Sequence, residues 1–138
     1  MSLDLPGGRP DTEVNIPTCI EIVPANNVRG KAILRWQMMV DQADIASKRF
    51  TSFKVTTRLE NRDAGGTDVV VTSKTCDFTA DVNMATANDP TKDLVCLSPA
   101  ATLDSSKQWS GDATAVYDVE GDGKGPITWH LNGSPLMS

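Results

Sequence analysis

The sequence predicts an all-β domain, an antiparallel β-sandwich or small barrel of about seven to eight strands with at most one short helix. Three observations predict it. Apolar and polar residues alternate along several short segments, as in strands that bury one face. Turn-forming Gly, Asn and Asp separate these segments every ten to fifteen residues or so. The chain has 138 residues, which suits a single domain.

The chain is predicted to begin with an arm and to continue as one domain. Residues 1–13 are expected to form an extended N-terminal arm, because the run from Gly7 to Pro10 cannot hold regular structure. Residues 14–138 are expected to form a single β-domain. Arms of this kind often lie across a neighbouring subunit in symmetric assemblies.

The clearest strands lie in the first half of the chain. Residues 31–40 place four apolar side chains on one face, Leu34, Trp36, Met38 and Val40. A strand over residues 50–60 points another set inward, Phe53, Val55, Thr57 and Leu59. The turn over residues 61–66 ends in two glycines, which can take the positive φ of a hairpin, and a return strand begins at Val69. Residues 75–82 continue that strand or begin another after a bulge.

The second half is less regular until a final hairpin. Residues 93–97 fit a short strand or one helical turn. Residues 98–109 fit one short helix, with Ser98 as its cap and Pro99 at its first position. The two strands of the final hairpin point these side chains inward: Ala113, Ala115, Tyr117 and Val119, then Ile127, Trp129 and Leu131.

The charge balance argues against nucleic acid as the main partner. The net charge is −5, from 13 basic and 18 acidic residues, so the surface repels phosphates on average. A local basic stripe is the exception, formed by Lys48, Lys54, Arg58 and Arg62. It would contact phosphates or an acidic partner, and the alternative is the solvated face of an amphipathic strand. No apolar run approaches the roughly 20 residues of a membrane span, and no signal peptide is expected.

The three cysteines fit poorly with a fully paired secreted framework, because their number is odd. Cys76 is expected to be a buried free thiol, and a Cys76–Cys96 bridge is the alternative. Cys19, Trp36 and Cys76 also resemble the spacing of an immunoglobulin domain, in which a disulfide packs on a tryptophan. Lys74 stands where that family has a tyrosine, and a core tryptophan in an unrelated sandwich is the other interpretation.

Three carboxylates at alternate positions form a candidate metal site, Asp118, Glu120 and Asp122. With the following Gly123 they resemble the first half of an EF-hand calcium loop, and hard cations need several such oxygens around one centre. Trp129 stands where that loop has its bidentate glutamate. The alternative is an acidic hairpin turn, so calcium is the one cofactor that the sequence suggests.

Large apolar side chains give a candidate pocket formed by Trp36, Met38, Met39 and Trp109. Methionine adapts to irregular ligands, although ordinary core packing gives the same pattern. His130 is the only histidine and lies opposite the inward face of its strand. No nucleophile motif accompanies it, so an exposed strand histidine is expected and no catalytic residue is assigned.

These observations predict a non-enzymatic structural building block, a coat, decoration or filament subunit that assembles into homo-oligomers through its β-domain and N-terminal arm. The alternative is a secreted or surface binding module for a protein, sugar or lipid. A second alternative is a small β-barrel isomerase or cyclase, with Asp112 or Asp118 as acid or base. A virion, another assembly or an extracellular setting is expected in preference to a cytoplasmic enzyme.

Overall fold

The computed structural model describes residues 2–3, 12–38, 49–83 and 93–137. In this part of the chain, two antiparallel sheets of six and four strands pack face to face. The predicted all-β fold class is therefore confirmed. Of the two predicted architectures, the sandwich is the one that forms, and the barrel is not.

The six-stranded sheet is built on one long central strand. Its members are β1 (Ser2–Leu3), β2 (Thr12–Asn15), β3 (Thr18–Val23), β4 (Asn27–Met38), β7 (Leu94–Leu97) and β8 (Ala101–Thr102). β2 and β3 pair in succession with one side of β4, and β7 and β8 pair with the other. Pro17 separates β2 from β3, because its nitrogen has no hydrogen to donate to a ladder.

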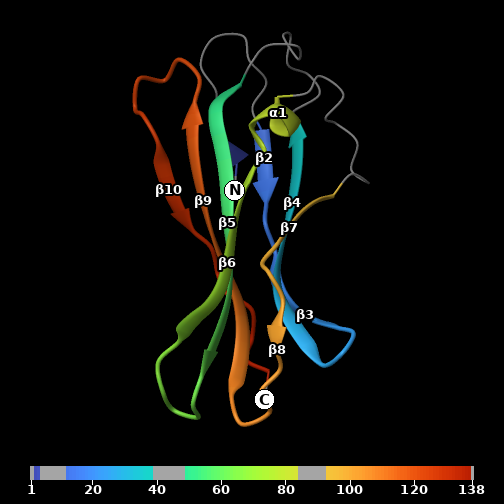
Figure 1. Ribbon diagram of the computed structural model, residues 1–138. Coiled ribbons are helices and arrows are strands. Elements are labelled where there is room, and N and C mark those ends of the chain that lie inside the picture. Colours follow the sequence, from blue (N-terminus) through green and yellow to red (C-terminus); the bar gives the residue numbers. More distant parts are fainter. Residues whose placement is uncertain (1, 4–11, 39–48, 84–92, 138) are drawn as a thin grey trace.

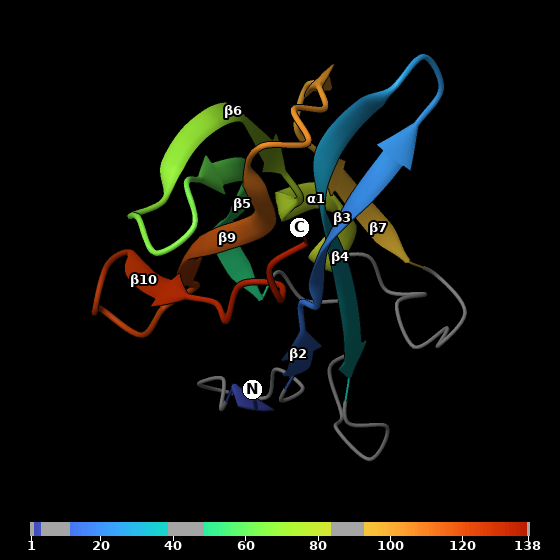
Figure 2. The same ribbon diagram turned by 90° about the horizontal axis from the view of Figure 1, so that it is seen from below.

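The four-stranded sheet has the order β10-β9-β5-β6. Its members are β5 (Phe50–Arg62), β6 (Val69–Asp77), β9 (Gln108–Val119) and β10 (Ile127–His130). β5 and β9 are the long central strands, and β6 and β10 are the edges. Figures 1 and 2 show this sheet and the layer that contains β3, β4 and β7 from two directions.

Strict alternation along the central strands fills the space between the sheets. The predicted inward set of β5 is confirmed, because Phe53, Val55, Thr57 and Leu59 are all fully buried. The predicted inward set of β9 is confirmed as well, since Ala113, Ala115, Tyr117 and Val119 are buried. Thr57 is the polar member, and its hydroxyl donates a hydrogen bond to the Cys96 carbonyl at 3.2 Å. That bond offsets the cost of burying the hydroxyl.

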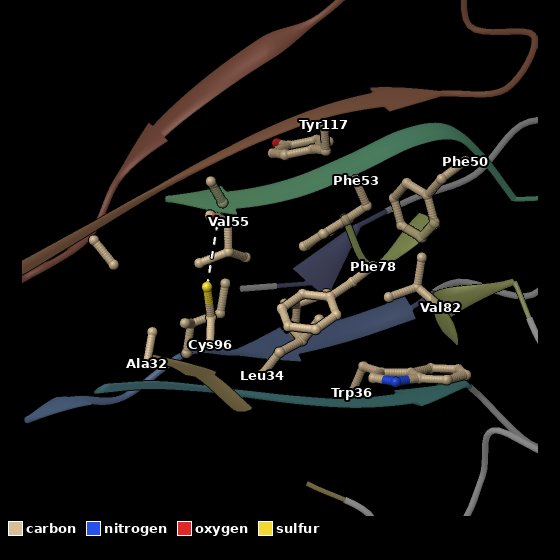
Figure 3. Packing of buried hydrophobic residues seen from close by; sticks show 14 of the residues in the cluster. Ala32, Leu34, Trp36, Phe50, Phe53, Val55, Phe78, Val82, Cys96 and Tyr117 are labelled. Carbon is tan, nitrogen blue, oxygen red and sulfur yellow. Dashed lines mark hydrogen bonds between the residues drawn. The ribbon is translucent and has the colours of Figure 1, made fainter. Parts of the chain in front are cut away.

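Aromatic rings form the centre of the main core (Figure 3). The Phe53 ring stacks on Tyr117 with centroids 5.9 Å apart and meets Phe50 edge-on at 5.2 Å. From the facing sheet, Leu34 and Trp36 close this cluster. Burial raises the pKa of the Tyr117 phenol, and Asp122 adds to the rise. The predicted inward residues of the last strand, Ile127, Trp129 and Leu131, pack on the same cluster while remaining partly exposed.

A second, smaller core lies at the other end of the sandwich. Val28, Leu59 and Trp109 form it, with Met137 among the partly buried residues packed around them. Gly30 of β4 and Gly111 of β9 lie at the boundary between the two cores. A Cβ on Gly30 would lie 2.7 Å from the Arg58 carbonyl oxygen in the opposite sheet. Only a residue without a side chain lets the backbones approach this closely.

The one described helix differs from the predicted one. Residues 98–109 contain β8 and the start of β9, whereas α1 spans Thr79–Val82. Asp77, the last residue of β6, accepts hydrogen bonds from the backbone nitrogen and hydroxyl of Thr79, the first residue of the helix, at 3.0 and 2.6 Å. The predicted helix fails because Trp109 fills the smaller core as part of a strand paired with β5. Tertiary packing here outweighs the local capping signal.

A buried arginine holds α1 to the start of β5. Arg49 is fully buried, with its guanidinium 4.9 Å from the Trp36 ring and its Nη2 donating to the Val82 carbonyl. Burial lowers the pKa of this guanidinium to about 10. Asn83 completes the junction, because its Oδ1 accepts from the backbone nitrogens of Arg49 and Phe50 at 2.8 and 2.9 Å. Nothing in the sequence pattern had marked Arg49.

The first residues of the chain are joined to the six-stranded sheet. Ser2 and Leu3 pair with Glu13 and Thr12, and the Leu3 side chain belongs to the main core. Residues 4–11 of the predicted arm lie outside the described residues. The described part of the arm therefore contacts its own chain.

Candidate functional site

A disulfide bond joins the two sheets along one side of the sandwich. Cys76 of β6 is bonded to Cys96 of β7, and the prediction of a free Cys76 thiol is wrong. The alternative pairing is the one that forms. The immunoglobulin-like arrangement is wrong too, because Cys19 is free and half-buried on β3. Close by, the Thr72 hydroxyl donates a hydrogen bond to the Pro99 carbonyl at 2.7 Å, a second link between the sheets.

β6 is the longest edge strand among the described residues, with nine residues. Three consecutive valines open it, and their side chains are unusually exposed for apolar residues in a strand. Val69 is 60% exposed, Val70 50% and Val71 38%. Within the described residues no strand pairs with the outer edge of β6. An unpaired backbone edge flanked by apolar side chains is a template for another strand.

The open part of β6 has clear limits. A bulge opposite Leu59 and Glu60 disturbs the register with β5, so that Val70 pairs with Glu60 and Thr72 with Leu59. Lys74 and Asp77 place charges further along the strand, which protects that half of the edge. The segment from Val69 to Ser73 carries no charge. We call it the open edge.

The predicted basic stripe is largely neutralised by carboxylates. Arg58 lies 3.2 Å from Asp112 and 3.8 Å from Glu60, and Arg62 lies 3.8 Å from Asp68. Lys54 is exposed on the same face of β5, and Lys48 lies outside the described residues. The described members of the stripe therefore sit in a mixed-charge face.

The three candidate calcium ligands do not form an ion site. Glu120 accepts a hydrogen bond from the Thr51 hydroxyl at 2.5 Å, and Asp122 accepts one from the backbone nitrogen of Lys124 at 3.0 Å. Asp118 lies on β9 before the turn. Among the described residues, no group of three or more His, Cys, Asp or Glu side chains could hold a metal ion.

The candidate apolar pocket is not brought together either. Trp36 belongs to the main core and Trp109 to the smaller one, so the two indoles lie in different clusters. The Trp109 indole nitrogen donates to the Asp104 carbonyl at 2.9 Å, which fixes that ring in place. Met38 is in β4 by its backbone, and Met39 lies outside the described residues. Ordinary core packing explains both tryptophans.

The structure instead has a cleft on the side of the sandwich opposite the disulfide. It has a volume of about 320 Å³, and we call it the lateral cleft. Its lining residues are Asn15, Ile16, Pro17, Trp129, His130, Leu131 and Asn132. Next to these residues, the Thr18 hydroxyl links the two segments by donating a hydrogen bond to the Asn132 carbonyl at 2.9 Å. His130 is exposed, as predicted.

The comparisons with known proteins give no relative for this chain. No family model matches the sequence, and no significant match is found among curated proteins or among solved structures. In the described part of the chain, no helix has the length and apolar character needed to cross a membrane. Function has to be argued from the open edge and the lateral cleft.

Proposed function

We propose that the protein is a non-catalytic building block that assembles with further copies of itself through the open edge of β6. The exposure of Val69, Val70 and Val71 on an edge strand is the observation that carries this proposal. Burying these side chains in a second copy removes apolar surface from water, and the backbone groups of the edge gain partners at the same time.

A second copy fits the open edge because the edge can face itself. Antiparallel pairing about a two-fold axis at Val70 places Val69 opposite Val71 and Val70 opposite its own copy. In that register Asp68 faces Thr72, so no like charges lie opposite each other. Such an isologous contact needs only one surface patch, and it is the commonest way in which two identical chains associate.

The links beside the open edge support the same role. The disulfide and the Thr72 hydrogen bond hold β6 on the opposite sheet, so the strand is already ordered before a partner arrives. A preordered strand loses little conformational freedom on pairing. Disulfides persist in oxidising surroundings, which agrees with a virion or extracellular setting. The N-terminal arm is a secondary contact in this proposal, because Leu3 is buried within its own chain.

Solution mass tests the proposal. We expect the full chain of 14.8 kDa to elute in size exclusion with light scattering at a multiple of that mass, increasing with concentration. The variant Val70→Lys should remain monomeric over the same range, because it places a charge in the middle of the contact. The introduced ammonium group would lie beside Glu60 on the neighbouring strand, so the fold can accommodate the substitution.

The matched control is Val95→Lys, which changes another exposed valine (42%) on the edge strand β7. It should assemble like the original chain, while thermal unfolding confirms that both variants are folded. A strictly monomeric original chain at every concentration would contradict the proposal. Assembly that survives Val70→Lys unchanged would place the contact elsewhere and contradict the role of the open edge.

A further inference from the structure

The lateral cleft lies where the junction of β2 and β3 meets the end of β10. Asn15, Ile16 and Pro17 form one wall, and residues 129–132 form the other. At about 320 Å³ it lies at the lower end of the roughly 300–1,000 Å³ of ligand pockets, which suits a single small unit. β10 and β6 are opposite edges of their sheet, so the cleft is separate from the open edge.

Several polar groups of the cleft have no partner among the described residues. The side-chain amides of Asn15 and Asn132 make no hydrogen bond within the described part of the chain, and both side chains are exposed. The same holds for the indole N–H of Trp129, although that ring is half-buried. Two amides and an indole supply hydrogen-bond donors and acceptors without charge. They are free to bind a ligand.

The rest of the lining is apolar or aromatic. Ile16, Pro17 and Leu131 give it apolar walls, and Trp129 adds a ring that remains accessible. None of the lining residues is Asp, Glu, Lys or Arg, and His130 is the one lining side chain that can carry a charge, so a charged ligand would find at most one ion-pair partner on entering. A ligand that matches this lining is uncharged, carries several hydroxyl groups and has one apolar face.

We propose that the lateral cleft binds one unit of an uncharged carbohydrate. The C–H face of a sugar ring packs against the Trp129 indole and the apolar wall, as amphipathic aromatic rings allow. The sugar hydroxyls exchange hydrogen bonds with the Asn15 and Asn132 amides. This proposal is independent of self-assembly, because it uses no residue of β6.

Nuclear magnetic resonance on the full chain tests whether the lateral cleft binds a carbohydrate. A ¹⁵N–¹H spectrum has one indole signal for each of the three tryptophans, and Trp129→Phe identifies the signal of Trp129. The probes are neutral oligosaccharides of β-1,4-glucose, β-1,4-N-acetylglucosamine, α-1,4-glucose and α-1,6-mannose, each at about 10 mM, which reveals a millimolar Kd. We expect at least one of them to shift the Trp129 indole and the side-chain amides of Asn15 and Asn132. The indoles of Trp36 and Trp109 should stay in place.

The double variant Asn15→Ala, Asn132→Ala should bind that sugar roughly tenfold more weakly, since two hydrogen bonds are lost. Thr128→Ala is the matched control and should leave binding unchanged, because Thr128 lies on the face of β10 opposite Trp129 and does not line the cleft. Val70→Lys should also leave it unchanged, which separates this proposal from assembly. If none of the four sugars shifts Trp129, or if inorganic phosphate or glucuronate shifts it instead, the proposal is wrong.

Discussion

Gly111 of β9 lies directly against the backbone of Cys19 in β3, on the opposite sheet. A Cβ on Gly111 would come within 2.5 Å of the Cys19 carbonyl oxygen. Together with Gly30, it draws the two sheets together between the two cores, because Trp109 and Ala113 on either side of it belong to different clusters. The sandwich thus has a waist that depends on the absence of two side chains.

Gly111→Ala should therefore destabilise the fold, by about 3 kcal/mol or more, because rigid backbone opposes the added methyl group. Urea unfolding followed by tryptophan fluorescence measures it. Gly123→Ala is the comparison, since a Cβ there meets nothing within 4 Å and its φ of +69° costs an alanine only about 1–2 kcal/mol. Equal losses in the two variants would show that the sheets can separate at the waist.

Removing the disulfide should lower the free energy of unfolding by about 3 kcal/mol, the loop-closure value for cysteines 20 residues apart. The double variant Cys76→Ala, Cys96→Ala and the reduced protein should give similar losses. Cys19→Ser should lower the free energy of unfolding by less, because that thiol is free. Insensitivity of the original chain to reductant would mean that the bond contributes little to stability.

The turn between β3 and β4 contains an alanine in an unfavourable conformation. Ala25 has φ = +65° and is followed by Asn26 at +61°. Because left-handed backbone is costly for alanine and not for glycine, Ala25→Gly should stabilise the protein by about 0.5–1 kcal/mol. Asn26→Gly should increase the stability by less, since asparagine tolerates the left-handed conformation better than alanine does. Thermal unfolding of both variants gives the ranking, and a loss in Ala25→Gly would contradict it.

Stability should depend on the charge of Glu60 in an unusual direction. Burial raises the pKa of Glu60 above its ordinary 4.5, with Asp112 and Asp68 adding to the rise against the opposing effect of Arg58. The folded state thus binds this proton more tightly than the unfolded state, so the charged carboxylate reduces stability above its folded pKa. Glu60→Gln should be more stable than the original chain at pH 7. This gain should disappear as the pH falls below 4.5.

Glu21 is the opposite case, because its pKa is lowered in the folded state whereas that of Glu60 is raised. Its hydrogen bond with Arg29, at 2.9 Å, lowers the pKa of the Glu21 carboxyl. The contribution of this carboxylate is present above the ordinary pKa and is lost as the pH falls through the lowered value. Glu21→Gln should therefore reduce stability at neutral pH and have no effect in acid. The same sign for both variants would contradict the assignment.

Alternation made the central strands predictable, because burial on one face leaves a period of two that is visible in the sequence. Phe53 to Leu59 and Ala113 to Val119 follow it without exception. The helix could not be placed in the same way. Ser98 and Pro99 carry a helix-start signal that the packing of Trp109 overrides, whereas α1 has only four residues and no side-chain cap at its N-terminus.

The sequence did not predict the two candidate sites, because they depend on which strand lies at the edge of a sheet and on which distant segments meet there. Three consecutive valines cannot all point inward in a strand, so the segment Val69–Val71 indicates exposed apolar side chains as well as a strand. The lateral cleft joins residues 15–17 to residues 129–132, and no local pattern links segments so far apart. The disulfide was an open alternative until strand order set β6 beside β7.

The waist also separates two halves of the molecule that should differ in their resistance to local unfolding. The smaller half has three buried apolar residues at its centre, so its amides should exchange with solvent through local openings that leave the larger half closed. The open edge belongs to this weaker half, since Thr72 and Val70 pair with Leu59 and Glu60. Association through β6 would then slow hydrogen exchange well beyond the contact itself. A copy that docks there would stabilise the weaker half of its neighbour against local unfolding.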